Sequence, residues 1–199
     1  MKKPFESKAP RYQYFEIIIK RFWEYLKPYG FKNRKHLAFS KHVNDVIWSV
    51  GVIDITGFFH DYLQFTVEVC VYSDEMFKRI YPSRLNKEWS WLNSQIRFGL
   101  QKLGDIRCLE QEFGTSFYIY TLNQAYEFIE DALNVMKEKS MPLLQSIDST
   151  EKIVEIYRVF DKNRWMCSVK DEWQIEWELL IWDKKIDPLK SPYASWLKI

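Results

Sequence analysis

The chain has 199 residues, of which 47% are hydrophobic and 18% aromatic, with only 6 glycines and 7 prolines. This composition excludes a disordered, collagenous or low-complexity protein, because it supplies enough apolar surface to offset the entropy lost on folding. The formal net charge is only +2. Residues 1–35 nonetheless carry 10 basic and 3 acidic groups, a net +7, which leaves −5 on the remainder.

The cysteines and the N-terminus indicate a compartment. Cys70, Cys108 and Cys167 are far apart and form no C-x-x-C pair, which is typical of a reducing environment. The first residues lack the apolar core of a secretory signal, and no run reaches the length of a membrane span. We therefore expect a cytoplasmic protein that does not associate with membranes.

The first half of the chain predicts one helix followed by strands. Apolar residues at spacings of 3, 4 and 7 predict a helix over residues 10–27, ended by Pro28 and Gly30. Residues 37–41 and 46–55 flank a turn-forming segment at 42–45, which indicates a hairpin. Strict alternation over residues 63–72 then predicts a strand with one buried face.

Short strands and then helices are predicted in the second half. Residues 96–101, 106–113 and 115–121 are strand-like, and residues 124–139 form an amphipathic run that Pro142 is expected to break or restart. Ser149 is a candidate N-cap for another helix. Residues 173–181 match a strand template better than a helical one, yet their Glu and Leu content favours helix, so both alternatives stay open.

These elements predict an α+β fold in which an antiparallel β-meander sheet is packed by an N-terminal helix and C-terminal helices. We expect one α+β domain over residues 1–160, with a Trp-rich extension over residues 161–199 packed on the same domain.

The sequence contains few patterns that indicate catalysis. His36, His42 and His60 have no metal-site spacing, and the glycine-rich phosphate loops and the Gly-x-Ser-x-Gly elbow are absent. We therefore predict no metal, no cofactor and no catalytic residues, and we favour a non-catalytic protein over an enzyme.

Polar residues of the predicted sheet are candidate binding residues. If the strands share one sheet, Gln64, Glu68, Arg97 and Gln101 lie on its less apolar side together with Ser49 and Thr66, and Gly51 and Gly99 leave room above it. The alternative is an ordinary solvent face with a weak Glu68–Arg97 ion pair. Trp89 and Trp91, two residues apart in a loop-like stretch, are candidate interface anchors, although partial burial would also explain them.

Several short motifs resemble a known family. The helix ends in Leu-Lys-Pro-Tyr-Gly-Phe-Lys (residues 26–32), a later segment reads Gln-Ile-Arg-Phe-Gly-Leu (95–100), and Met-Pro-Leu-Leu (141–144) precedes Ser-Thr-Glu (149–151). Over residues 10–160 this order resembles the domain-of-unknown-function family 4304 of bacterial proteins, although Met141 stands where the family usually has Leu. The resemblance implies no activity and no catalytic residues. Similar small α+β proteins occur near toxin loci, which implies an immunity-type role.

The functional hypothesis is therefore a binding protein that masks a toxin or another protein partner. The alternative is a small-molecule-binding domain or enzyme that uses the polar sheet face, with Glu68 and Arg97 as anchors. Nucleic-acid binding ranks third and is not expected. The sequence leaves the oligomeric state open.

Overall fold

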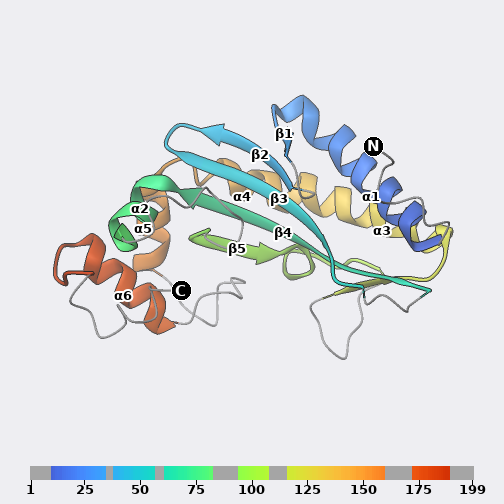
Figure 1. Ribbon diagram of the computed structural model, residues 1–199. Helices are drawn as coiled ribbons and strands as arrows, with labels where there is room; N and C mark the ends of the chain where they lie inside the picture. Colours follow the sequence, from blue (N-terminus) through green and yellow to red (C-terminus); the bar gives the residue numbers. More distant parts are fainter. Residues whose placement is uncertain are drawn as a thin grey trace, which may run out of the picture. The chain divides into compact units, whose positions relative to one another are not determined.

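The computed structural model describes residues 10–34, 38–56, 61–82, 94–107, 116–159 and 172–188 (Figure 1). Its α-helices are α1 (Pro10–Leu26), α2 (Asp74–Ile80), α3 (Leu122–Val135), α4 (Met141–Gln145), α5 (Thr150–Arg158) and α6 (Glu172–Trp182). Its strands are β1 (Lys32–Arg34), β2 (Ala38–Val43), β3 (Val46–Asp54), β4 (Leu63–Ser73), β5 (Ile96–Gly99) and β6 (Phe117–Ile119). The predicted α+β class is confirmed.

The strands form one antiparallel sheet of six strands in the order β1-β2-β3-β4-β5, with β6 paired to β4. A tight turn joins β2 to β3, and Asn44 in it takes a left-handed conformation with φ 49°, which asparagine tolerates better than most residues. At the start of β4, Leu63, Gln64 and Phe65 face Ile119, Tyr118 and Phe117 of β6. The meander is therefore consecutive from β1 to β5, and only β6 leaves that order.

The described chain falls into two compact units that are interleaved in sequence. The first unit comprises residues 1–41, 50–69 and 99–142, and the second comprises residues 42–49, 70–98 and 143–199. Strands β3 and β4 therefore contribute residues to both units.

In the first unit, helices α1 and α3 pack together over an aromatic core. Phe15, Ile18, Phe22 and Leu26 recur at helical spacing and are buried, as the periodicity predicts. The Phe22 ring stacks on Phe128 of α3 with centroids 6.4 Å apart, and Phe128 also contacts Phe65 and Phe117, each at 4.8 Å. A short 3-10 turn (Lys27–Tyr29) and Gly30, at φ 84°, end α1 because glycine alone adopts this conformation without strain.

In the second unit, helix α6 packs against both α2 and α5. Trp48 of β3 donates its indole N–H to the carbonyl of Ile147 at 2.8 Å, which anchors the segment before α5. Tyr81, after α2, lies 6.1 Å from the Trp177 ring of α6 and donates its hydroxyl to Glu178 at 2.7 Å. Long-range side-chain bonds thus hold this unit together.

The structure corrects one predicted element and decides one open alternative. The strand expected over residues 96–101 ends at Gly99, and a 3-10 turn (Leu100–Lys102) follows it. Residues 173–181 are helical, within α6, because an apolar segment with Trp, Ile or Leu at most positions satisfies the alternating pattern and the helical pattern equally. The strand expected over residues 106–113 lies mostly outside the described residues.

Pro142 does not end the third helix, which continues through a π-helical turn (Met136–Ser140) into α4. Ala132, Met136, Ser140 and Leu144 are all fully buried at a constant spacing of four residues. At about 100° per residue, three such steps would rotate the buried face of a regular α-helix by about 40° each. The wider π turn takes up this excess, so all four residues face the interior.

Candidate functional site

The predicted binding residues lie in different units. Gln64, Glu68 and Gln101 belong to the first unit and Arg97 to the second, and all four side chains are half-buried. Trp89 and Trp91 lie outside the described residues. The structure therefore brings Gln64 and Glu68 onto one face of β4, two strand repeats apart.

The room expected above the glycines is partly filled. A Cβ atom at Gly99 would meet the Gln101 amide at 2.5 Å, so the Gln101 side chain folds back over Gly99. Ser49 is also buried, with 1% of its surface exposed. In the first unit, the Gln101 side chain therefore fills the space that the sequence predicts above Gly99.

On the outer face of β4 in the first unit, the side chains are partly exposed. Leu63, Phe65, Val67 and Val69 are buried against the helices, whereas Gln64, Thr66 and Glu68 alternate with them and stay partly exposed. Ile55 donates its backbone N–H to the Gln64 carbonyl at 2.9 Å, which puts Ile55 opposite Gln64 and on the same face. Its side chain is 45% exposed.

Tyrosines dominate this outer face. Tyr118 is opposite Gln64 in the β4–β6 pairing, so Tyr118 and Tyr120 share its face, while Phe117 and Ile119 are buried on the other. The Tyr62 ring lies 5.7 Å from Tyr118 and 5.4 Å from Tyr120, and both pairs are tilted. Tyr120 is 56% exposed. We call the surface formed by Ile55, Tyr62, Gln64, Tyr118 and Tyr120 the tyrosine face.

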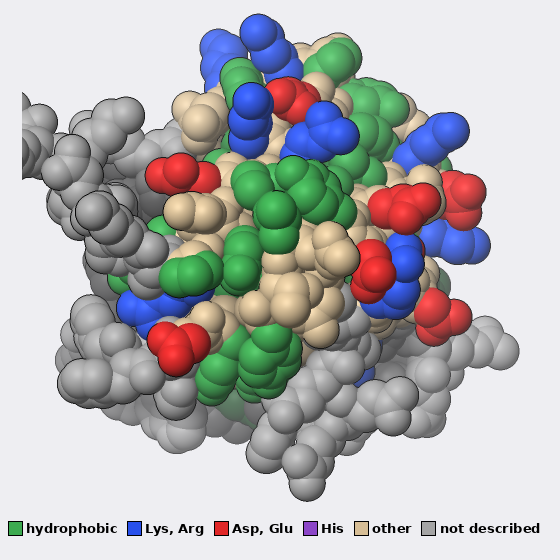
Figure 2. All heavy atoms as spheres, turned by 90° about the vertical axis from the view of Figure 1, so that its right-hand side faces the viewer, with side chains coloured by type: hydrophobic (Ala, Val, Ile, Leu, Met, Phe, Trp, Pro, Cys, Tyr) green, Lys and Arg blue, Asp and Glu red, His purple; other side chains and the backbone are tan. Residues whose placement is uncertain are grey.

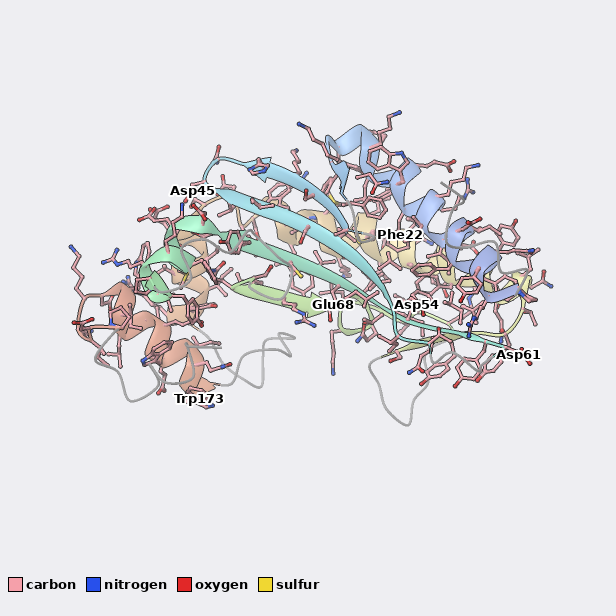
Figure 3. The ribbon with its side chains drawn as sticks, in the orientation of Figure 1. Phe22, Asp45, Asp54, Asp61, Glu68 and Trp173 are labelled. Carbon is pink, nitrogen blue, oxygen red and sulfur yellow. The ribbon has the colours of Figure 1, made fainter. Side chains whose placement is uncertain are left out.

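Figure 2 faces the end of the first unit where β4 begins, and it shows hydrophobic side chains gathered near the centre of the view, with both basic and acidic side chains around them. Figure 3 places Asp54, Asp61 and Glu68 along β3 and β4, with Phe22 among the helices that cover the other face of the sheet. The exposed members of the tyrosine face are Ile55 and Tyr120, whereas Tyr62, Gln64 and Tyr118 are half-buried.

The sequence carries half of the signal for this face in each of two separate segments. Tyr118 and Tyr120 are two residues apart, as are Tyr62 and Gln64, so each pair shares one strand face. Only the pairing of β4 with β6 brings the pairs together, and that pairing joins segments more than 50 residues apart.

A second polar cluster, in the second unit, is buried except for Asp45. The Ser73 and Thr150 hydroxyl groups are 2.6 Å apart, and Thr150 donates its backbone N–H to Asp45 at 3.0 Å. Gln95 accepts from the Ser73 N–H at 2.7 Å, and Tyr157 donates to the Gln95 carbonyl at 2.7 Å. Ser73 and Thr150 have no exposed surface, so a substrate cannot reach their hydroxyl groups, although Asp45 itself is exposed. We assign the cluster a structural role.

The carboxyl group of Asp45 has a lowered pKa because of its hydrogen bonds within that cluster. Partial burial raises the pKa of Asp45, but hydrogen bonds from the hydroxyl and backbone N–H of Thr150 outweigh it and hold the pKa below its usual value. Cys70 is buried in β4 and carries no disulfide. Within the described ranges, no group of three His, Cys, Asp or Glu side chains could hold a metal ion.

No helix of the described part of the chain is long and apolar enough to cross a membrane. No curated protein and no solved structure matches the chain. The family described as "Domain of unknown function (DUF4304)" matches residues 22–146, which run from the last turn of α1 to the end of α4 and include every strand of the described residues. The match covers more than half of the chain and includes the whole tyrosine face. The chain therefore belongs to the DUF4304 family.

Proposed function

We propose that this protein is a non-catalytic binding protein that docks a protein partner on its tyrosine face. The observation that supports the proposal is the ring cluster of Tyr62, Tyr118 and Tyr120 on one face of the sheet, of which Tyr120 is 56% exposed. Tyrosine supplies large contact area with a hydroxyl at its tip and is enriched at protein interfaces. Rings already held by cross-strand contacts lose little conformational freedom on binding, so the entropy cost of ordering them in the complex is small.

The most specific form of the proposal makes the partner a toxin, with this protein as its immunity-type inhibitor. In that role the tyrosine face would cover a functional surface of the toxin, and charged groups around it would set the rate of encounter. A small-molecule site on the polar sheet face stays a prediction that no observation here favours.

Co-expression with the product of the neighbouring gene tests the proposal. We expect the two proteins to co-purify, and we expect Tyr118→Ser and Tyr120→Ser to weaken the complex at least tenfold, because each removes an aromatic anchor. Tyr126→Ser is the matched control, since Tyr126 is 51% exposed but lies on α3, outside the tyrosine face.

Two outcomes would count against the proposal. Equal loss of binding in the Tyr126 variant would show that the tyrosine face is not the docking surface. A stable complex that neither face variant weakens would lead to the same conclusion. Where the partner is toxic to the host cell, protection by the wild-type protein and its loss in the Tyr120 variant give a second readout.

A further inference from the structure

We propose that the end of helix α1 and the adjoining part of strand β2 form a second docking surface, which binds a short acidic segment of a protein. We call this surface, formed by Trp23, Lys27 and Lys41, the lysine face. All three residues belong to the first unit, and none belongs to the tyrosine face. The lysine face is therefore a separate surface that does not depend on the proposed function.

The chain around the lysine face is the most basic part of the sequence. Residues 25–44 contain five lysine or arginine residues and no aspartate or glutamate. The end of α1 lies beside β1 and β2 (Figure 1), so residues from both sides of the β1 turn meet there. Lys27 is exposed and makes no ion pair with any described residue. Such a local excess of positive charge favours an anionic partner.

Ring stacking and helical spacing bring the three side chains together. Trp23 stacks on Phe39 of β2, with ring centroids 5.9 Å apart and planes 16° apart. Lys41 follows Phe39 by two residues, so both side chains lie on the same face of β2. Lys27 follows Trp23 by four residues, which makes the two side chains neighbours on the surface of α1.

The turn that ends α1 completes the arrangement. Gly30 donates its backbone N–H to the Lys27 carbonyl at 3.0 Å. A Cβ atom at Gly30 would lie 3.7 Å from Cε of Lys41, so the Lys41 side chain runs over this turn. Lys41 therefore approaches the segment that carries Lys27, although the two residues are far apart in sequence.

The polar groups of the lysine face are hydrogen-bond donors. Trp23 is half-buried, and its indole N–H has no acceptor among the described residues. An indole N–H and an ammonium group donate and cannot accept, whereas an ionised carboxylate only accepts. Hydrogen bonds between such groups are strengthened by charge. Aspartate and glutamate side chains therefore match both the charge and the donors of this surface.

A short acidic segment fits this surface better than a nucleic acid. A nucleic acid carries negative charge along its whole length and favours proteins with an extended basic surface. The exposed side of α1 also carries Glu16 and Glu24, and Glu24 is bound by Arg21 at 3.1 Å and by Lys20 at 4.0 Å. The remainder of the chain, after residue 35, has a net charge of −5. A continuous polyanion would meet these carboxylates, whereas a short peptide can avoid them.

Calorimetric titration of the full chain tests this inference. The probes are a ten-residue alternating Glu-Gly peptide, its neutral Gln-Gly counterpart and a ten-nucleotide oligothymidine. We expect the Glu-Gly peptide to bind at least about fivefold more tightly than either of the other probes, because only this peptide is both short and rich in carboxylates. Doubling the ionic strength should weaken its binding, since charge attraction is screened.

Variants identify the site. Lys27→Gln and Lys41→Gln should each weaken binding of the Glu-Gly peptide at least about threefold, because each removes one charged donor. Trp23→Phe keeps an aromatic ring for the stack and should weaken binding through loss of the indole N–H. The matched control is the Lys102→Gln, Lys184→Gln double variant, which removes two exposed lysines elsewhere and should bind as wild type does. Unaltered circular dichroism and melting temperature confirm that each variant is folded.

Three results would overturn the inference. Equal binding of the Glu-Gly peptide to wild type and to the folded Lys27→Gln, Lys41→Gln double variant would show that the lysine face is not the site. Equal weakening in the control variant would show that only the net charge matters. Tighter binding of oligothymidine would make a nucleic acid the occupant. Tyr120→Ser, which tests the tyrosine face, should leave binding of the Glu-Gly peptide unchanged, so the two proposals can fail separately.

Discussion

Thr150 joins three segments of the second unit through one hydroxyl and one backbone N–H. It bonds Asp45 of the β2–β3 turn and Ser73 at the start of α2, and it is itself the first residue of α5. We expect Thr150→Val, which keeps the shape but removes the hydroxyl, to lower the free energy of unfolding by about 1–3 kcal/mol, because the buried Ser73 hydroxyl then loses its hydrogen bond with Thr150. Thr150→Ser keeps the hydroxyl and should cost less. Urea denaturation compares the two variants, and equal stability would contradict the prediction.

Asp131 of α3 is the clearest pH-dependent residue. Its carboxylate accepts hydrogen bonds from Arg107 at Nε (2.7 Å), Nη2 (2.8 Å) and the backbone N–H (2.9 Å). The side-chain bonds of Arg107 hold the pKa of Asp131 below its usual range, although partial burial opposes them. A carboxylate with a depressed folded-state pKa contributes stability above its unfolded pKa of about 4, and this stability is lost as the pH falls through the folded value.

The measurement is the difference in unfolding free energy between wild type and Asp131→Asn across a pH series. Wild type should be the more stable protein at neutral pH, and the difference should shrink progressively below about pH 4. Glu138→Gln, at an exposed position of the same continuous helix, serves as the control. A difference that does not change with pH would mean that Asp131 stabilises the protein through packing alone.

At the scale of elements, periodicity predicts those helices and strands whose formation depends on nearby residues alone. Helix α1 and strand β4 follow directly from spacings of 3.6 and 2, and the Ser149 cap of α5 is confirmed by its bond from the Lys152 N–H at 3.3 Å. Helix α2 was missed because seven residues are too few for a periodic pattern, although Ser73, Asp74 and Glu75 are typical of a helix start. The tyrosine face depends on strand pairing, which no local pattern records.

The start of α3 offers a test of one element. Thr121 accepts from the Gln124 N–H at 3.2 Å, and the Gln124 side chain accepts from the backbone N–H groups of Thr121 (3.1 Å) and Tyr120 (2.8 Å). This capping box fixes the strand end that carries Tyr120. We expect Thr121→Ala to lower the free energy of unfolding by about 1 kcal/mol. Gln124→Ala should lose two acceptor bonds, whereas Gln124→Glu should keep them.

A double-mutant cycle measures how strongly the Thr121 and Gln124 caps depend on each other. Because each side chain helps to hold the other, the combined Thr121→Ala, Gln124→Ala variant should lose less stability than the sum of the single variants. Strict additivity would show that the two caps act independently. Weaker binding by the folded Gln124→Ala variant would further connect the cap with the presentation of Tyr120 under the proposed function.

At the scale of the whole molecule, the two units are compact but share their longest strands. Residues 50–54 of β3 and 63–69 of β4 belong to the first unit, and the remainder of each strand belongs to the second. Val52 of β3 is buried in the first unit, and Val71 of β4 is buried in the second. Because each strand has residues in both units, loss of either strand would affect both cores. Interleaving of this kind favours a single cooperative unfolding transition over independent domains.

Hydrogen exchange with matched core variants tests this cooperativity. Ile129→Val removes one buried methylene from α3 in the first unit, and Ile153→Val removes one from α5 in the second, each at a cost of about 1 kcal/mol. Under global exchange, Ile129→Val should reduce the protection of the slowest amides of α5 by the same free energy as those of α3, and Ile153→Val should do the reverse. Protection that falls only in the unit carrying the substitution would show that the units unfold separately, because the free energy of a local opening depends only on the residues that open.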